Sequence, residues 1–141
     1  MALHHNLNHG VCLLCDSKVK TAHPYLRELW PKIKTQFPLT HVSWGFRNAE
    51  EQELMVSTGA SFAHWPKSDH NKMDSANQPC SRAIDLFSYT EDGAAVWSYW
   101  QFKKIWEWIQ ENDFPVLWGG DWPGKKKDSP HYYLKESIKQ P

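Results

Sequence analysis

One carboxylate inside an apolar segment constrains this chain more than any other feature of its sequence. The segment AIDLFSY, residues 83–89, has the aliphatic and aromatic content of a β-strand, and its one charged residue is Asp85. A charge among apolar side chains is costly unless an opposite charge or a metal ion lies beside it. The segment therefore predicts a buried strand in which Asp85 has an ionic partner.

Three further segments have the pattern of strands, and they lie at residues 41–46, 115–118 and 131–135. Helical spacing of apolar residues marks residues 23–37, where Pro24 suits the first turn and Pro31 is expected to kink or divide the helix. A second helix should begin at Asn48, with Glu51 completing a capping box, and end at Gly59. We therefore expect an α+β fold in which helices pack on a small antiparallel sheet.

A third helix is predicted for residues 94–112, because large apolar side chains recur there at helical spacing. The pattern assigns five residues to its inner side, and we expect them to pack in the core rather than to bind a ligand: Trp97, Trp100, Ile105, Trp108 and Ile109. Residues 60–82 have the composition of a long loop. Loops of this length in compact domains are usually functional or disordered.

Length and charge narrow the functional classes. A chain of 141 residues is sufficient for one domain, which we expect to span residues 1–141 as a monomer. Lysine plus arginine equals aspartate plus glutamate at 16 each, so no basic excess points to nucleic acid or to a membrane surface. No segment predicts membrane insertion or a secretory signal, which indicates synthesis in a cytoplasm.

Three cysteines, Cys12, Cys15 and Cys80, do not predict a disulfide framework. Cys12 and Cys15 form a single C-x-x-C pair three residues after His9. A structural zinc site usually needs four ligands, often from two such pairs. We expect the pair to pack as free thiols, with a local metal or redox role as the alternative.

Two histidines and Asp85 form a candidate metal site. His70 lies in the polar loop, and His131 begins the last predicted strand. Catalytic zinc commonly takes three ligands from histidine and carboxylate side chains and leaves the fourth position open. Strands are rigid supports, so Asp85 and His131 are expected on neighbouring strands. Scattered histidines and aspartates are common, and hydrogen-bonded or surface residues are the alternative.

The order of these residues resembles a family of peptidases. The segments SDHN, SRAIDL and DSPHYYL are similar to the S-x-H, A-x-D and D-x-x-H motifs of zinc D-alanyl-D-alanine carboxypeptidases and phage L-alanyl-D-glutamate endolysins. These proteins share a metal-binding fold with the hedgehog signalling domain. An upstream segment, GFRNAEEQ, resembles the family's Y-R-S-x-x-x-Q motif, and the likeness covers residues 21–134. The insert KMDSANQPC departs from the compact motif, as do Tyr132 and Tyr133 after the last histidine.

The resemblance implies roles for eight residues. It implies Zn²⁺ held by His70, Asp85 and His131, and Asp128 as the general base, with Asp121 as the alternative base. It also implies that Arg47 holds the substrate carbonyl or the developing oxyanion. Ser68 and Gln52 are the residues expected to contact substrate, with support of the His70 loop as the alternative for Ser68.

The resemblance implies a zinc-dependent peptidase that cleaves the stem peptides of peptidoglycan. We expect a phage endolysin of the L-alanyl-D-glutamate type, made without a signal peptide and released to the cell wall through a holin-like pore. A D-Ala-D-Ala carboxypeptidase is the alternative enzyme. An inactive zinc-containing binding module is the alternative of another class.

Overall fold

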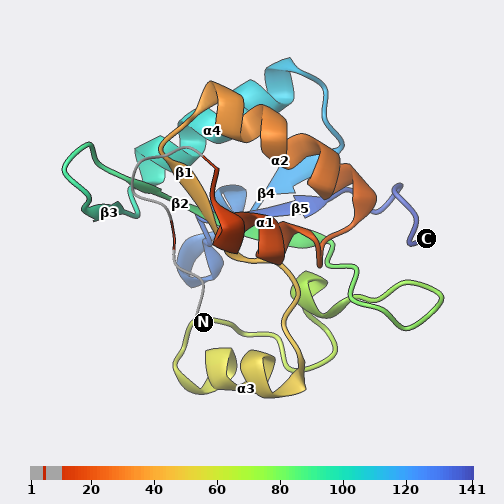
Figure 1. The fold of residues 1–141 in the computed structure, drawn as a ribbon. Helices are drawn as coiled ribbons and strands as arrows, with labels where there is room; N and C mark the ends of the chain where they lie inside the picture. The colour runs from red at the N-terminus through yellow and green to blue at the C-terminus, as the bar shows by residue number, and fades with distance from the viewer. Residues whose placement is uncertain (1–4, 6–10) are drawn as a thin grey trace.

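The structure is a computed structural model, and it describes residue 5 and residues 11–141 (Figure 1). The α-helices and β-strands, in chain order, are α1 Leu13–Val19, α2 Pro24–Gln36, β1 Thr40–Trp44, α3 Ala49–Ser57, β2 Ala83–Tyr89, β3 Ala95–Val96, α4 Tyr99–Glu111, β4 Val116–Trp118 and β5 His131–Leu134. The five strands form one sheet of order β1-β2-β5-β4, and β3 pairs with β2 beyond the end of β5. All pairings are antiparallel, which confirms the predicted α+β class.

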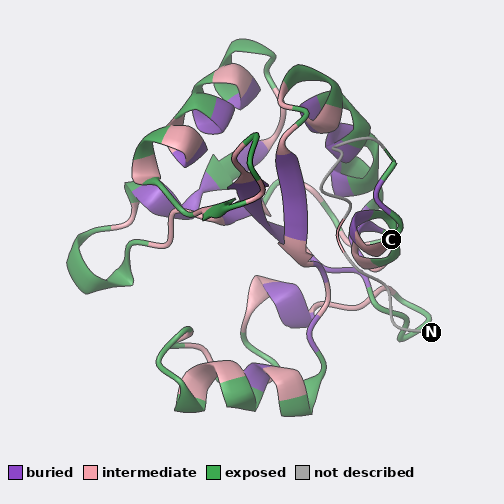
Figure 2. Cartoon of the chain, turned by 60° about the vertical axis from the view of Figure 1, so that its left-hand side comes forward, coloured by how far each residue is buried: buried purple, intermediate pink, exposed green. Residues whose placement is uncertain are grey.

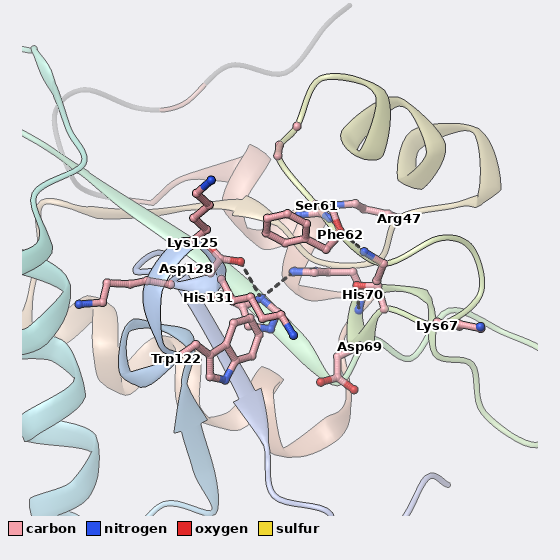
Figure 3. Close-up of a pocket in the computed structure, with 16 residues that line it drawn as sticks. Arg47, Ser61, Phe62, Lys67, Asp69, His70, Trp122, Lys125, Asp128 and His131 are labelled. Atoms are coloured by element: carbon pink, nitrogen blue, oxygen red, sulfur yellow. Dashed lines mark hydrogen bonds and ion pairs between the residues drawn. The ribbon is translucent and has the colours of Figure 1, made fainter.

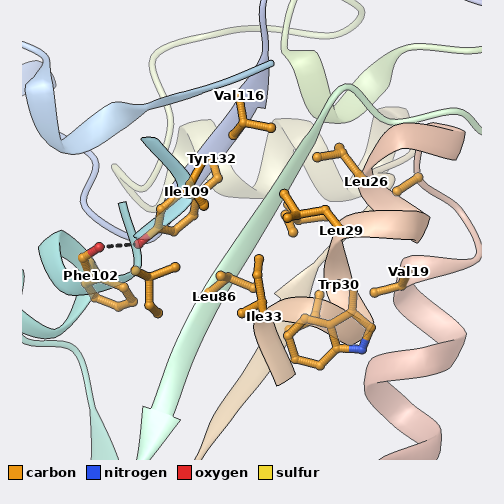
Figure 4. Packing of buried hydrophobic residues seen from close by; sticks show 14 of the residues in the cluster. Val19, Leu26, Leu29, Trp30, Ile33, Leu86, Phe102, Ile109, Val116 and Tyr132 are labelled. Carbon is orange, nitrogen blue, oxygen red and sulfur yellow. Dashed lines mark hydrogen bonds between the residues drawn. The ribbon is translucent and has the colours of Figure 1, made fainter. Parts of the chain in front are cut away.

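The two faces of the sheet have different roles. Ile84 and Leu86 lie on one face of β2, opposite Tyr132 of β5 and Val42 of β1 respectively. Helices α2 and α4 cover this face and complete the apolar core (Figures 1 and 4). Because successive strand residues point to opposite faces, Asp85 lies on the other face. The core therefore fixes the strand that carries Asp85 without surrounding its carboxylate.

Helix α2 continues through Pro31, so of the two predicted effects of this proline the structure excludes division of the helix. One face of the helix carries four buried residues, Leu26, Leu29, Trp30 and Ile33. Tertiary packing along this face outweighs the one backbone hydrogen bond that a proline removes.

Helix α3 begins as predicted. The Asn48 side chain accepts from the Glu51 backbone N–H, and the Glu51 side chain accepts from the Asn48 N–H, each at 2.9 Å. Gly59 follows the helix with φ of +80°, the left-handed conformation expected of a closing glycine. Figure 2 shows that α3 lies apart from the layered core and presents mainly exposed and half-buried residues.

Helix α4 is shorter than predicted, because residues 95–96 pair with β2 as strand β3. Its buried residues are Phe102, Ile105, Trp106 and Ile109. Trp97 and Trp100 are 54% and 67% exposed, so their assignment to the inner side was wrong. Trp97 precedes the helix, and Trp100 lies in its first turn outside the buried face. No helix among the described residues has the length and apolar character to span a bilayer.

Candidate metal centre and pocket

Three side chains from separate parts of the chain meet at one point. His70 lies in a 3₁₀ turn, Asp69–Asn71, while Asp85 of β2 and His131 of β5 are direct partners across the sheet. His70 Nε2 lies 3.1 Å from Asp85 Oδ1 and 3.2 Å from His131 Nδ1. His131 Nδ1 lies 3.0 Å from the same Asp85 oxygen. All three residues are buried, and the structure therefore brings the predicted ligand set together.

The hydrogen bonding of His70 determines which of its atoms faces this point. His70 Nδ1 lies 2.7 Å from the carbonyl oxygen of Gly45, which can only accept. Nδ1 therefore carries the proton of the neutral ring, and Nε2 presents a lone pair. A lone pair, a second imidazole nitrogen and a carboxylate oxygen then converge within 3.0–3.2 Å, an arrangement that suits a shared cation.

Burial and charge act in opposite directions on these groups. Burial lowers the pKa of His70, which favours the neutral ring that a metal requires. Burial alone would raise the pKa of Asp85, but the His70 and His131 side chains hold it well below its usual value. Burial likewise opposes the charge on His131, yet the hydrogen bond and charge of Asp85 raise its pKa. The site thus favours an ionised Asp85 and a positive charge beside it.

Arg47 supplies the second ionic contact of Asp85. Its Nη2 donates to Asp85 Oδ2 at 2.9 Å, which leaves Oδ1 for the two histidines. Its Nη1 donates to Gln52 Oε1 at 3.3 Å, and its guanidinium lies over the Trp44 ring at 5.0 Å. Arg47 is only 6% exposed, although it also lines the pocket described below. The ionic partner predicted for Asp85 therefore includes an arginine as well as the candidate metal.

Gln52 has no exposed surface. Both the nitrogen and the oxygen of its side-chain amide make hydrogen bonds. Its Nε2 donates to Ser61 Oγ at 3.0 Å and to the Ala63 carbonyl at 2.7 Å. Its Oε1 accepts from Arg47 and, at 3.1 Å, from Asn71 Nδ2. These contacts favour a role in positioning Arg47 and the residue 61–63 loop over the direct substrate contact predicted from the sequence.

Ser68 and Asp121 occupy different environments. Ser68 caps the 3₁₀ turn, since its Oγ accepts from the His70 N–H at 3.2 Å, and it also lines the pocket. This is the loop-supporting contact that the sequence left as the alternative for Ser68. Asp121 is exposed and does not line the pocket, unlike Asp128.

A pocket of about 440 Å³ opens above the three ligand candidates. Figure 3 shows Trp122 and Asp128 beside His131 on one side, and Arg47 and His70 on the other. Lysines surround the opening, from Lys67 and from the consecutive residues 125–127. The Trp122 ring packs against the His131 ring with centroids 5.1 Å apart. Trp122 and this lysine group were not predicted from the sequence, because loop residues show their orientation only once the loop is folded.

Asp128 brings a carboxylate to the pocket beside His131. Its Oδ2 lies 3.9 Å from His131 Nδ1, too far for a hydrogen bond. Burial and, next, the charge of Asp85 raise the pKa of Asp128 to about 6. Its backbone N–H donates to the Gly119 carbonyl at 2.9 Å, and a Cβ on Gly119 would lie only 2.5 Å from the Asp128 carbonyl oxygen. Gly119 thus permits the close approach that brings Asp128 beside the centre.

Comparison with known proteins yields a likeness to solved structures. No protein-family model and no curated protein sequence matches the chain. Among solved structures, the Serratia marcescens L-Ala D-Glu endopeptidase ChiX is similar with a TM-score of 0.67 and 23% sequence identity, over 86% of each chain. The chain therefore shares the α+β fold of that endopeptidase over most of the length of both proteins.

Proposed function

We propose that this protein is a zinc-dependent peptidase that cleaves the stem peptides of peptidoglycan, at the bond between L-alanine and D-glutamate. The observation that carries the proposal is the convergence of His70, Asp85 and His131 below a pocket that also holds the carboxylate of Asp128. The motif order in the sequence and the fold shared with an L-Ala D-Glu endopeptidase support it. Synthesis from a phage genome and release through a host pore belong to the same proposal.

The ligand candidates fit zinc in chemistry and in spacing. Zinc bound by nitrogen and oxygen at about 2.0–2.2 Å in a tetrahedron has ligand atoms about 3.3 Å apart. The three separations here, 3.0–3.2 Å, approach that value. Two imidazoles and one carboxylate are a ligand set that catalytic zinc uses, with the fourth position left to water or substrate. When bound, zinc would lower the pKa of water to about 7 and polarise the scissile carbonyl.

Asp128 would move the proton during hydrolysis. As a carboxylate it takes a proton from the attacking water, whose oxygen forms a bond to the carbonyl carbon. It then gives that proton to the leaving amine as the C–N bond breaks, so the balance is one water consumed for one amide cleaved. Asp128 suits this exchange because its side chain reaches the pocket without a hydrogen bond to His131.

Arg47 would contribute in two ways. Its ion pair with Asp85 fixes the orientation of that ligand, and supporting contacts of this kind affect both metal affinity and activity. Its charge also lies at the pocket wall, where the substrate carbonyl acquires negative charge in the transition state. We propose Gln52 and Ser68 as the residues that hold Arg47 and His70 in place.

The pocket rim is complementary to an acidic peptide. Lys67 and the lysines at 125–127 place positive charge around the opening. A stem peptide with D-glutamate carries carboxylates next to the bond to be cut, and opposite charges favour its approach and orientation. Phe62 and Trp122 offer apolar surface at the same opening for the small alanine side chain.

Mass spectrometry of purified peptidoglycan after incubation with the zinc-loaded protein tests the proposal. We expect fragments with a new amino terminus at D-glutamate, and none with the His131→Ala variant. Release of terminal D-alanine instead would identify a D-Ala-D-Ala carboxypeptidase. Binding to peptidoglycan without any cleavage would identify a non-catalytic module and overturn the proposal.

A further inference from the structure

A second group of metal-binding side chains lies apart from the pocket, and we call it the N-terminal cluster: His5, Cys12, Cys15 and His41. One ligand atom from each residue lies within 4.8 Å of all the others. Cys15 Sγ lies 3.3 Å from His41 Nδ1 and 3.4 Å from His5 Nδ1. Cys12 Sγ lies 3.5 Å from the same His5 atom. Four ligand atoms from three segments of the chain therefore surround one point.

These separations match the edges of a zinc tetrahedron. With zinc–sulfur bonds of about 2.3 Å and zinc–nitrogen bonds of about 2.0–2.1 Å, sulfur and nitrogen ligands lie about 3.6 Å apart. The three contacts measure 3.3–3.5 Å. Two cysteines and two histidines are also one of the common ligand sets of structural zinc. We infer that the N-terminal cluster binds a zinc ion that stabilises the fold and takes no part in the reaction.

Backbone donors already support the two sulfur atoms. The Val42 N–H donates to Cys15 Sγ and the Cys15 N–H donates to Cys12 Sγ, each at 3.3 Å. Such contacts orient metal-binding sulfurs and stabilise negative charge on them. Lys18 and Lys34 lie close enough to interact with both cysteines. Two thiolates neutralise a divalent ion, so the loaded cluster carries no net charge that these lysines would oppose.

The elements that the cluster joins explain its structural role. Cys12 and Cys15 lie at the start of α1, which has only seven residues, and His41 lies on β1. A helix this short is marginal without tertiary contacts. Within the described part of the chain β1 pairs with β2 alone, so its other edge depends on α1 for cover. A zinc ion bound by Cys12, Cys15 and His41 would link α1 to β1 and stabilise their packing.

Access distinguishes the cluster from the candidate catalytic centre. Cys12, Cys15 and His41 are buried, and no member of the cluster lines the pocket. Four protein ligands close the coordination of zinc, whereas catalytic zinc keeps one position open. The cluster shares no residue with His70, Asp85 and His131, so each site can be removed separately.

Metal analysis of the purified full chain tests the inference directly. We expect two zinc ions per chain in the wild type, one in the Cys12→Ser/Cys15→Ser variant and one in His70→Ala. Cys80→Ser is the matched control, because Cys80 is buried but lies outside the cluster, and it should retain both ions. Titration of the wild type and of His70→Ala with a thiol-reactive mercurial should release one zinc ion from each.

Cobalt provides a measurement on the wild type itself, so its main result does not depend on any variant folding. The wild type loaded with Co²⁺ should show a thiolate-to-cobalt charge-transfer absorption, which His70→Ala retains and His5→Ala weakens. The inference is overturned if the wild type shows no such absorption, if the mercurial modifies Cys12 and Cys15 without releasing zinc, or if these two cysteines form a disulfide. Failure to cleave peptidoglycan would leave these results unchanged, so the two proposals are tested separately.

Discussion

The Nδ1 atom of His70 is hydrogen-bonded to the carbonyl oxygen of Gly45 at 2.7 Å, and this contact fixes the orientation of the ring in the candidate metal centre. Gly45 is itself tightly enclosed, because a Cβ at this position would lie 2.3 Å from the Lys18 carbonyl oxygen. A displaced Gly45 must therefore move the partner of His70.

Gly45→Ala should weaken both the fold and the centre. Added bulk in a packed region costs about 1–3 kcal/mol of unfolding free energy. Disturbed support of a ligand histidine should lower zinc affinity about 10–100-fold. Gly59→Ala is the comparison, since its positive φ costs about 1–2 kcal/mol while no atom lies near its Cβ. Equal zinc affinity in Gly45→Ala and wild type, measured by competition with a chelator, would contradict this role.

Removal of metal should lower the melting temperature. An ion present at 100 times its dissociation constant stabilises the native state by about 2.7 kcal/mol, which corresponds to roughly 10 °C for a domain of this size. Chelation of the Cys12→Ser/Cys15→Ser variant isolates the contribution of the centre formed by His70, Asp85 and His131. A melting curve unchanged after verified loss of zinc from that variant would show that this centre does not stabilise the fold.

Asp128 and Asp121 should differ in their effect on catalysis. Asp128→Ala should retain zinc and the native fold while turnover falls about 10²–10⁴-fold, the contribution typical of a positioned acid–base group. Asp121→Ala is the matched control, because this aspartate is exposed and does not line the pocket. Quantified cleavage of peptidoglycan by each variant decides the assignment, and a larger loss in Asp121→Ala would reverse it.

Activity should decrease in acid as Asp128 becomes protonated. Burial raises the pKa of Asp128 to about 6 in the metal-free protein, and a bound cation would lower it. A general base acts in its ionised form, whose fraction rises with pH, so kcat/KM should fall as the pH drops below 6 and level off above it. Zinc content measured at each pH distinguishes this fall in kcat/KM from a loss of activity that is caused by loss of metal. If kcat/KM of Asp128→Asn falls equally steeply in acid, the group that titrates is not Asp128.

Local sequence patterns correctly predicted the structural features that depend on residues close together in the sequence. The capping box of Asn48 and Glu51 formed as expected, and β2 has the predicted bounds, 83–89. The predicted start of α4 was wrong because residues 95–96 fold back on the end of β2 as a short antiparallel hairpin, and this strand pairing outweighs helical periodicity. Local propensity therefore predicted which helices and strands form more reliably than it predicted the boundaries between them.

The candidate site was predictable as a set of residues but not as a network. The motif order named His70, Asp85 and His131 together. It did not indicate that Arg47 would pair with Asp85, or that Gln52 would be buried with its amide fully bonded. His41 was overlooked because the alternation of Val42 and Trp44 accounted for its segment as a strand. Its nearness to Cys15 depends on tertiary packing of α1 against β1.

The burial of α3 has a consequence for the motions of the pocket. Gln52 is the one buried residue among those described for this helix, so polar contacts rather than apolar packing hold it to the rest of the molecule (Figure 2). Segments with few buried apolar contacts open at low free energy, without unfolding of the core. In native-state hydrogen exchange, we expect the α3 amides to exchange well before those of α2 and α4. The wall formed by residues 59–63 can then yield to an incoming peptide while the strands that carry Asp85 and His131 remain intact.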